Sequence, residues 1–164
     1  MRFEKVSLEQ FTKDVLELYP DTNIEKIKEA WEELELPKRA TKGSAGYDFH
    51  IPFSMKFYVD MDKVVPTGIK AYVDPGYVLM IFPRSGLGFK YGIHLMNTVG
   101  VIDEDYVNAE NEGHIMIALK NGDVKSLMLE QGDRFAQGVF LPYGTVDNDK
   151  TKTKRTGGMG STGE

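Results

Sequence analysis

Residues 83–88 place an arginine, a serine and two glycines directly after an apolar segment. A guanidinium, a hydroxyl and flexible backbone amides are groups that bind phosphate oxygens, so Arg84, Ser85 and Gly86 are candidate phosphate ligands. The glycine spacing does not fit a dinucleotide-binding loop, no helix is expected after it, and the chain lacks a P-loop motif. This segment therefore predicts a phosphate cradle on irregular backbone.

Residues 97–106 combine an amide, three consecutive acids and an aromatic ring. An isolated acidic run is usually a solvated turn or a weak calcium site. Apolar residues precede Asp103, however, and favour a partly shielded carboxylate that could act as a general base. Backbone groups and Asn97 could recognise a flat base, while Tyr106 could lie against a sugar and exclude a 2′-hydroxyl.

Two further segments offer phosphate contacts. Gln137 could donate to a phosphate oxygen, or it could be a satisfied residue in a strand-entry turn. Residues 157–163 follow Lys154 and Arg155 and offer amides and hydroxyls that could fold around a polyphosphate. The alternative for this tail is a solvated terminus.

Composition excludes several classes of protein. The 164 residues include no cysteine, so thiolate chemistry, zinc–thiolate sites and disulfides are impossible. The net charge of −5 argues against duplex binding. No apolar run approaches the roughly 20 residues of a membrane helix, and no signal-peptide pattern is present, so we expect a cytoplasmic protein. His50, His94 and His114 show no metal-ligand spacing with one another or with an acidic partner and are expected to be structural or surface residues.

The elements that position these residues begin with a predicted helical hairpin over residues 7–36. Ser7 stands three residues before Gln10, and Thr22 three before Glu25, which is the spacing of a capping box. Apolar residues recur at three- and four-residue steps in both segments, and a proline closes each one. We expect the two apolar stripes to be packing faces rather than partner surfaces.

The rest of the chain predicts an all-β body. Short β-rich runs alternate with turn residues, which is typical of a sandwich or jelly-roll-like barrel. The expected strands are 1–6, 47–51, 56–59, 68–73, 77–82, 94–97, 115–119, 126–129 and 135–142. We therefore expect a single β domain over residues 1–144 and a flexible C-terminal arm over residues 145–164.

Taken in order, five segments resemble the five motifs of the trimeric dUTP diphosphatase (dUTPase) family. The segments are residues 45–48, 83–86, 100–106, 134–137 and 157–163, and the resemblance spans residues 37–163. It implies a β-clip, jelly-roll-like distorted barrel in a homotrimer, with active sites at subunit interfaces and each arm closing a neighbour's site. It also implies hydrolysis of dUTP to dUMP and pyrophosphate, which limits uracil in DNA and supplies dUMP for dTTP synthesis.

The resemblance also implies residue roles. Asp103 activates the water that attacks the α-phosphorus, Tyr106 packs on deoxyribose and Asn97 helps to read uracil. Asp48 and Arg134 support the site, and Mg²⁺ is held by substrate phosphates and waters rather than by a protein metal site. The other implied substrate-binding residues are Arg84, Ser85, Gly86, Gly100, Val101, Ile102, Gln137, Lys154, Arg155, Met159, Gly160 and Ser161.

The chain departs from the family pattern in several places. Met159 stands where the family carries an aromatic that stacks on uracil. The spacing before Gly157 is one residue short, so either Lys154 or Arg155 takes the γ-phosphate role. Residues 107–113 resemble an insertion beside the catalytic loop, and the hairpin is a second addition.

Two alternatives follow from the same features. A dCTP deaminase shares this fold and would release ammonia from dCTP rather than pyrophosphate from dUTP. A regulatory module would instead capture a protein partner at the hairpin or at residues 107–113, in addition to catalysis. Deletion of residues 7–36 distinguishes a partner surface from a packing role.

Overall fold

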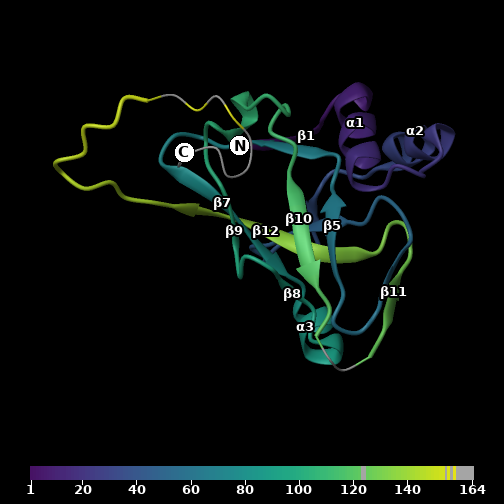
Figure 1. Ribbon diagram of the computed structural model, residues 1–164. Coiled ribbons are helices and arrows are strands. Elements are labelled where there is room, and N and C mark those ends of the chain that lie inside the picture. Colours follow the sequence, from purple (N-terminus) through teal and green to yellow (C-terminus); the bar gives the residue numbers. More distant parts are fainter. Residues whose placement is uncertain (123–124, 154, 156, 158–164) are drawn as a thin grey trace.

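The computed structural model describes residues 1–122, 125–153, 155 and 157, and its regular structure is mostly β with few helices (Figure 1). None of the helices within this described part combines the length and apolar character needed to cross a membrane. The elements are β1 (Arg2–Lys5), α1 (Leu8–Leu18), α2 (Ile24–Glu33), β2 (Lys38–Arg39), β3 (Tyr47–His50), β4 (Met55–Phe57), β5 (Asp62–Pro66), β6 (Ile69–Tyr72), β7 (Tyr77–Pro83), α3 (Ser85–Tyr91), β8 (His94–Leu95), β9 (Gly100–Ile102), the 3₁₀-helix η1 (Tyr106–Asn108), β10 (Met116–Lys120), β11 (Leu127–Leu129) and β12 (Arg134–Pro142).

The largest sheet has five strands in the order β2-β3-β12-β7-β9, and all its pairs are antiparallel. A second sheet has the order β5-β10-β8. Alternate residues of both sheets enter one buried cluster that contains Phe49, Leu79 and Phe135 from the first sheet and Val65 and Ile117 from the second. The two sheets are therefore held together by a shared apolar core.

The predicted helical hairpin forms α1 and α2 beside one end of the sheets (Figure 1). The Ser7 side chain caps α1 by accepting from the Gln10 amide, as the capping-box spacing predicts. For α2 the prediction is wrong by one residue. Asn23 is the cap, because its side chain accepts from the amide of Glu25 at 2.8 Å. Thr22 precedes the helix.

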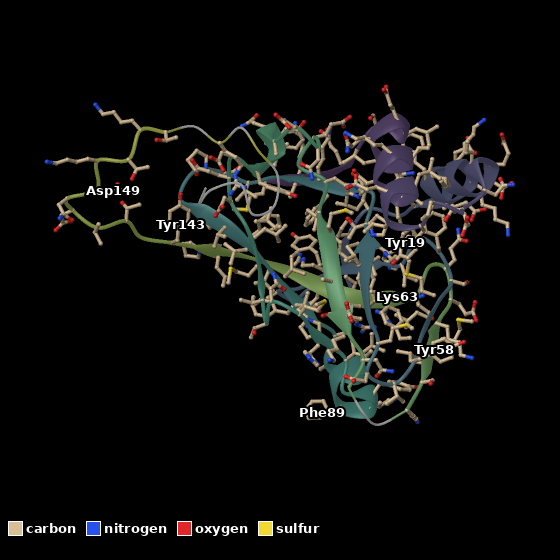
Figure 2. The ribbon with its side chains drawn as sticks, in the orientation of Figure 1. Tyr19, Tyr58, Lys63, Phe89, Tyr143 and Asp149 are labelled. Atoms are coloured by element: carbon tan, nitrogen blue, oxygen red, sulfur yellow. The ribbon has the colours of Figure 1, made fainter. Side chains whose placement is uncertain are left out.

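The apolar faces of the two helices are packing faces. Val6, Phe11, Val15 and Ile27 form a second buried cluster, and Phe53 packs against it from the β body. Tyr19 points from α1 toward β5, where its hydroxyl donates to the carbonyl of Val64 at 2.6 Å (Figure 2). The hairpin is therefore part of the folded body through both apolar and polar contacts.

The strand predictions locate most of the β elements, but the sequence reading missed β2, β5 and β9. The expectation of an all-β body is wrong at one place, because α3 spans Ser85–Tyr91 and includes Gly86 and Gly88; the element after Gly92 is the strand β8. The seven residues of α3 are too short for an apolar period, and the helix ends at Gly92, whose φ of 67° lies in the left-handed region that glycine favours. After β12 the arm leaves the sheets, carrying Tyr143 and Asp149 outward (Figure 2).

Candidate functional site

A pocket of about 530 Å³ lies where β8, β9 and β10 meet the end of the arm. Its inner wall is apolar and includes Ile81, Leu95 and Ile117, all of which are buried. Seven of the residues singled out from the sequence line it: Asn97, Gly100, Val101, Ile102, Asp103, Tyr106 and Arg155. The pocket therefore combines an apolar wall, large enough to contact a nucleobase, with a few polar groups at one side.

Asp103 follows directly after β9, and the pairing of β9 with β7 fixes the position of the Asp103 backbone. Its side chain is 50% exposed, so the preceding apolar residues shield it less than the sequence predicts. Arg155 reaches it from the arm. The guanidinium Nη2 lies 2.6 Å from Asp103 Oδ2, and Nε lies 3.1 Å from Asp105 Oδ1. The sequence reading gave no partner role to Asp105, because pairing with a residue 50 positions later leaves no local signal.

Tyr106 lies in the 3₁₀-helix that follows the acidic run, and only 4% of it is exposed. Its hydroxyl donates to the carbonyl of His114 at 2.9 Å and accepts from the amide of Asn111 at 3.2 Å. Burial raises the pKa of the Tyr106 phenol, which keeps it neutral at physiological pH. Both hydrogen bonds of the Tyr106 hydroxyl are therefore made within the protein, which leaves the ring as the part of Tyr106 that can contact a ligand in the pocket.

A turn presents Asn97 to the same pocket. The amide of Thr98 donates to the carbonyl of Leu95 at 3.0 Å, and Thr98 has a φ of 67°. This left-handed residue reverses the chain between β8 and β9 and keeps Asn97 at the pocket wall.

The candidate phosphate ligands form a second group around Asp48 of β3. Asp48 pairs with Arg84 Nε at 3.3 Å through one oxygen and with Arg134 Nη1 at 3.2 Å through the other. Gln137 lies opposite Asp48 in the sheet, and its Nε2 donates to the carbonyl of Pro83 at 3.3 Å. Asp48 therefore orients two guanidinium groups at the end of β7, where Ser85 and Gly86 begin α3.

The two groups of residues lie apart within one chain. Leu79 pairs with Ile102, so Asp103 comes level with Val78, and Arg84 follows six residues further along. At about 3.3 Å per residue, this places the two ends roughly 20 Å apart along β7. A single chain therefore brings together the residues expected to recognise a base and to activate water, but not the candidate phosphate ligands.

Four predicted site residues lie outside the described part of the chain: Lys154, Met159, Gly160 and Ser161. The same holds for most of the predicted motif over 157–163. Within the described ranges, no three histidine or acidic side chains converge as a metal site.

His114 is a buried structural residue, and its acidic partner lies far away in the sequence. His114 is fully buried, and its Nδ1 lies 2.6 Å from Asp14 Oδ2 in α1. Its Nε2 accepts from the amide of Gly68 at 2.7 Å, so the proton sits on Nδ1 and the imidazole is neutral. A separation of 100 residues hides this pair from any local pattern.

Most of the chain is similar to known dUTPases. Residues 32–163 match the family model described as dUTPase. The deoxyuridine 5′-triphosphate nucleotidohydrolase of Lactococcus lactis is 44% identical over 133 residues, which cover 79% of this chain and 89% of that protein. The crystal structure of dUTPase from Streptococcus mutans superposes with a TM-score of 0.66 at 37% identity, covering 90% of this chain and 99% of that one. The dUTPase from phage phi11 of S. aureus shares the fold, with a TM-score of 0.62 at 22% identity over 74% of this chain and 92% of that chain.

Proposed function

This chain belongs to the dUTPase family and is a dUTP nucleotidohydrolase, and on that premise we propose that Asp103 activates the water that attacks the α-phosphorus. The observation that carries the proposal is the pocket itself. It unites a half-exposed carboxylate, an amide and a tyrosine ring around one apolar wall. Those are the groups needed to hold a base and a sugar beside a general base.

The reaction follows from these positions. Asp103 accepts a proton from a water as its oxygen bonds to the α-phosphorus, and the bond from that phosphorus to the bridging oxygen breaks. Pyrophosphate leaves with the bonding electrons, and dUMP remains. Asp103 has no covalent role in this sequence, because it only orients and deprotonates the water.

Selection of deoxyuridine falls to Asn97 and Tyr106. The Asn97 amide carries both a donor and an acceptor, which suits the edge of uracil. The Tyr106 ring lies against the deoxyribose, and its buried hydroxyl leaves no polar group there to receive a 2′-hydroxyl. A ribonucleotide would therefore lose the hydration of that hydroxyl without gaining a partner.

The phosphate ligands come from another copy of the chain. Arg84, Ser85, Gly86 and Gln137 lie too far from Asp103 for one triphosphate to touch both groups within a subunit. A homotrimer with active sites at its interfaces joins the two groups. Exposed apolar side chains beside both support such contacts. Phe89 of α3, labelled in Figure 2, is 93% exposed, and Val101 of β9 is 54% exposed.

The carboxylates at the pocket suit a Mg²⁺ ion that enters bound to the substrate. The pocket offers carboxylate oxygen at Asp103, with Asp105 paired to the same arginine beside it, and Mg²⁺ prefers oxygen ligands while keeping several waters. Bound to the triphosphate, it lowers the charge that Asp103 would otherwise repel. The residues of this chain then orient the water and the nucleotide.

The arm completes the site. Arg155 lies at the pocket beside Asp103, so it is well placed to meet a phosphate when substrate displaces it from the carboxylates. Lys154 remains the alternative for the γ-phosphate. The finer architecture proposed with this mechanism is a β-clip, jelly-roll-like domain over residues 1–144, with an arm over residues 145–164. In the single chain Arg155 of the arm contacts Asp103 of its own pocket. In the homotrimer we propose that each arm makes this contact in a neighbouring subunit's pocket.

A pyrophosphate-release assay with dUTP, UTP, dTTP and dCTP in the presence of magnesium tests reaction, sugar and base together. We expect release from dUTP and little from the other three nucleotides. Ammonia from dCTP without pyrophosphate from dUTP would instead identify a deaminase of the same fold.

A further inference from the structure

The two segments that are additional to the family pattern contact each other. Glu112, in the segment 107–113, accepts hydrogen bonds from the Ser7 amide at 2.9 Å and from the Ser7 hydroxyl. Lys70 Nζ lies 3.3 Å from the same carboxylate. The start of α1 is therefore bound to the loop that follows Tyr106, and neither segment is simply an exposed addition to the body.

A second and buried contact runs through Asp14 and His114. Asp14 is 9% exposed, and both its oxygens accept from Gln10 Nε2 at 2.9 Å. One of them also accepts from His114 Nδ1, while the Gly68 amide donates to the other ring nitrogen. Phe11 packs edge-on against the imidazole, with 6.0 Å between the ring centroids. Every polar atom of the imidazole has a partner, so its orientation is fixed.

The backbone of His114 connects this fixed imidazole to Tyr106 in the candidate site. Its carbonyl accepts from the Tyr106 hydroxyl at 2.9 Å and from Asn111 Nδ2 at 3.3 Å. Gly113, directly before it, has a φ of 71° and lies so close to Val107 that a Cβ would approach the Val107 Cα to 2.6 Å. The loop from Tyr106 to His114 thus folds tightly on itself, and the Asp14 contact is its anchor to α1.

We propose that Asp14 is a positioning residue for sugar selection: through His114 it holds the Tyr106 ring at the distance that admits deoxyribose and excludes ribose. The inference rests on the proposed role of Tyr106. A 2′-hydroxyl is excluded by fit, and displacement of a positioned group by about 1 Å is enough to change a rate by about a hundredfold. Loss of the Asp14 carboxylate frees the imidazole, and with it the carbonyl that orients Tyr106.

The test compares Asp14→Ala with Tyr19→Phe. Both changes remove hydrogen bonding between the α1 region and the β body, but the Tyr19 bond ends on the carbonyl of Val64 in β5 rather than on the loop that holds Tyr106. The readout is the ratio of kcat/KM for dUTP to that for UTP, measured with the thermal midpoint. We expect Asp14→Ala to lower this ratio about tenfold or more, and Tyr19→Phe to leave it unchanged even though its midpoint falls.

Asp14→Asn keeps an oxygen that can accept from His114 Nδ1, so it should restore most of the selectivity lost in the alanine variant. If Asp14→Ala does not fold, Tyr106→Phe serves as the test, because it removes the hydroxyl that donates to His114 and should lower the ratio by itself. Selectivity equal to wild type in the folded test variant would overturn the proposal, and so would a loss in Tyr19→Phe equal to that in Asp14→Ala.

A double-mutant cycle with Tyr106→Phe adds an independent check, because that variant removes the hydroxyl that donates to His114. If the effect passes through this bond, the two changes together should cost less selectivity than the product of the single effects. Independent effects would contradict the link. Failure of the wild type to release pyrophosphate from dUTP would be a different result, since it would refute the proposed function rather than the role of Asp14.

Discussion

Arg155 Nη2 lies 2.6 Å from Asp103 Oδ2, so the arm contacts the carboxylate to which we assign water activation. The same guanidinium pairs with Asp105 and lies over the Tyr106 ring, 5.3 Å from its centroid. We expect substrate phosphates to compete for this cation and to release Asp103 toward a water. This competition would link substrate binding to activation of the general base through one side chain.

Replacement of Arg155 by alanine should lower kcat/KM for dUTP by about ten- to hundredfold, because hydrogen bonds to charged groups contribute roughly 1.5–3 kcal/mol. Steady-state kinetics measure the effect. Lys152→Ala is the matched control, since it removes one positive charge from an exposed position of the arm. A normal rate in Arg155→Ala with a loss in Lys154→Ala would assign the γ-phosphate to Lys154.

Truncation after Asp149 should reduce turnover on the order of a hundredfold, because the site loses its closing segment while water gains access. The arm is exposed from Gly144 to Thr153, so its removal should leave the fold intact. Size-exclusion chromatography and thermal unfolding check the fold and assembly beside the rate. Full activity in the shortened chain would mean that the arm has no catalytic part.

Gly113→Ala should destabilise the protein more than Gly132→Ala. Both glycines have positive φ, of 71° and 84°, so both substitutions carry left-handed strain. Only at Gly113 would the new methyl also meet backbone, at 2.6 Å from Val107 Cα, whereas nothing lies within 4 Å at Gly132. Left-handed strain costs about 1–3 kcal/mol, and the clash adds to it. Equal thermal midpoints for the two variants would show that the loop accommodates the new methyl group at Gly113 without additional loss of stability.

Acid should destabilise the wild type more steeply than Asp14→Asn. Burial alone would raise the pKa of Asp14, but hydrogen bonds from His114 and Gln10, together with the charge of Lys13, hold it below its ordinary value. The ionised group therefore stabilises the fold above its unfolded pKa of about 3.9, and this contribution is lost as the pH falls through the lower folded pKa. Thermal midpoints measured from pH 6 to pH 3 check this. Parallel curves for the two proteins would refute the contribution.

The parts that could be predicted from the sequence depend on neighbours in the chain. The Ser7 cap and most strands follow from local spacing and composition, and the dUTPase family follows from five motifs in order. The helix after Arg84 was missed because a seven-residue, glycine-containing segment has no readable apolar period. The short strand β9 was missed because its pairing with β7 is a tertiary contact.

The candidate site likewise has a part that local sequence predicts and a part that depends on tertiary packing. The residues of the segment 97–106 enter one pocket because they are adjacent in sequence and fold as a turn and a short strand. The separation of Arg84 from Asp103 depends instead on the register of β7 with β9, and the Asp14–His114 pair on the docking of α1. No pattern in the chain encodes either distance, since each arises only when remote elements pack.

The most direct test of the account is the turnover of Asp103→Asn with dUTP. The amide keeps the size of the side chain but cannot accept the proton of the water, so we expect dUTP binding near that of wild type and pyrophosphate release slower by about two to four orders of magnitude. Isothermal titration with a non-hydrolysable dUTP analogue and a single-turnover assay measure the two quantities. Turnover equal to wild type in this variant would contradict the assignment of Asp103 as the water-activating residue.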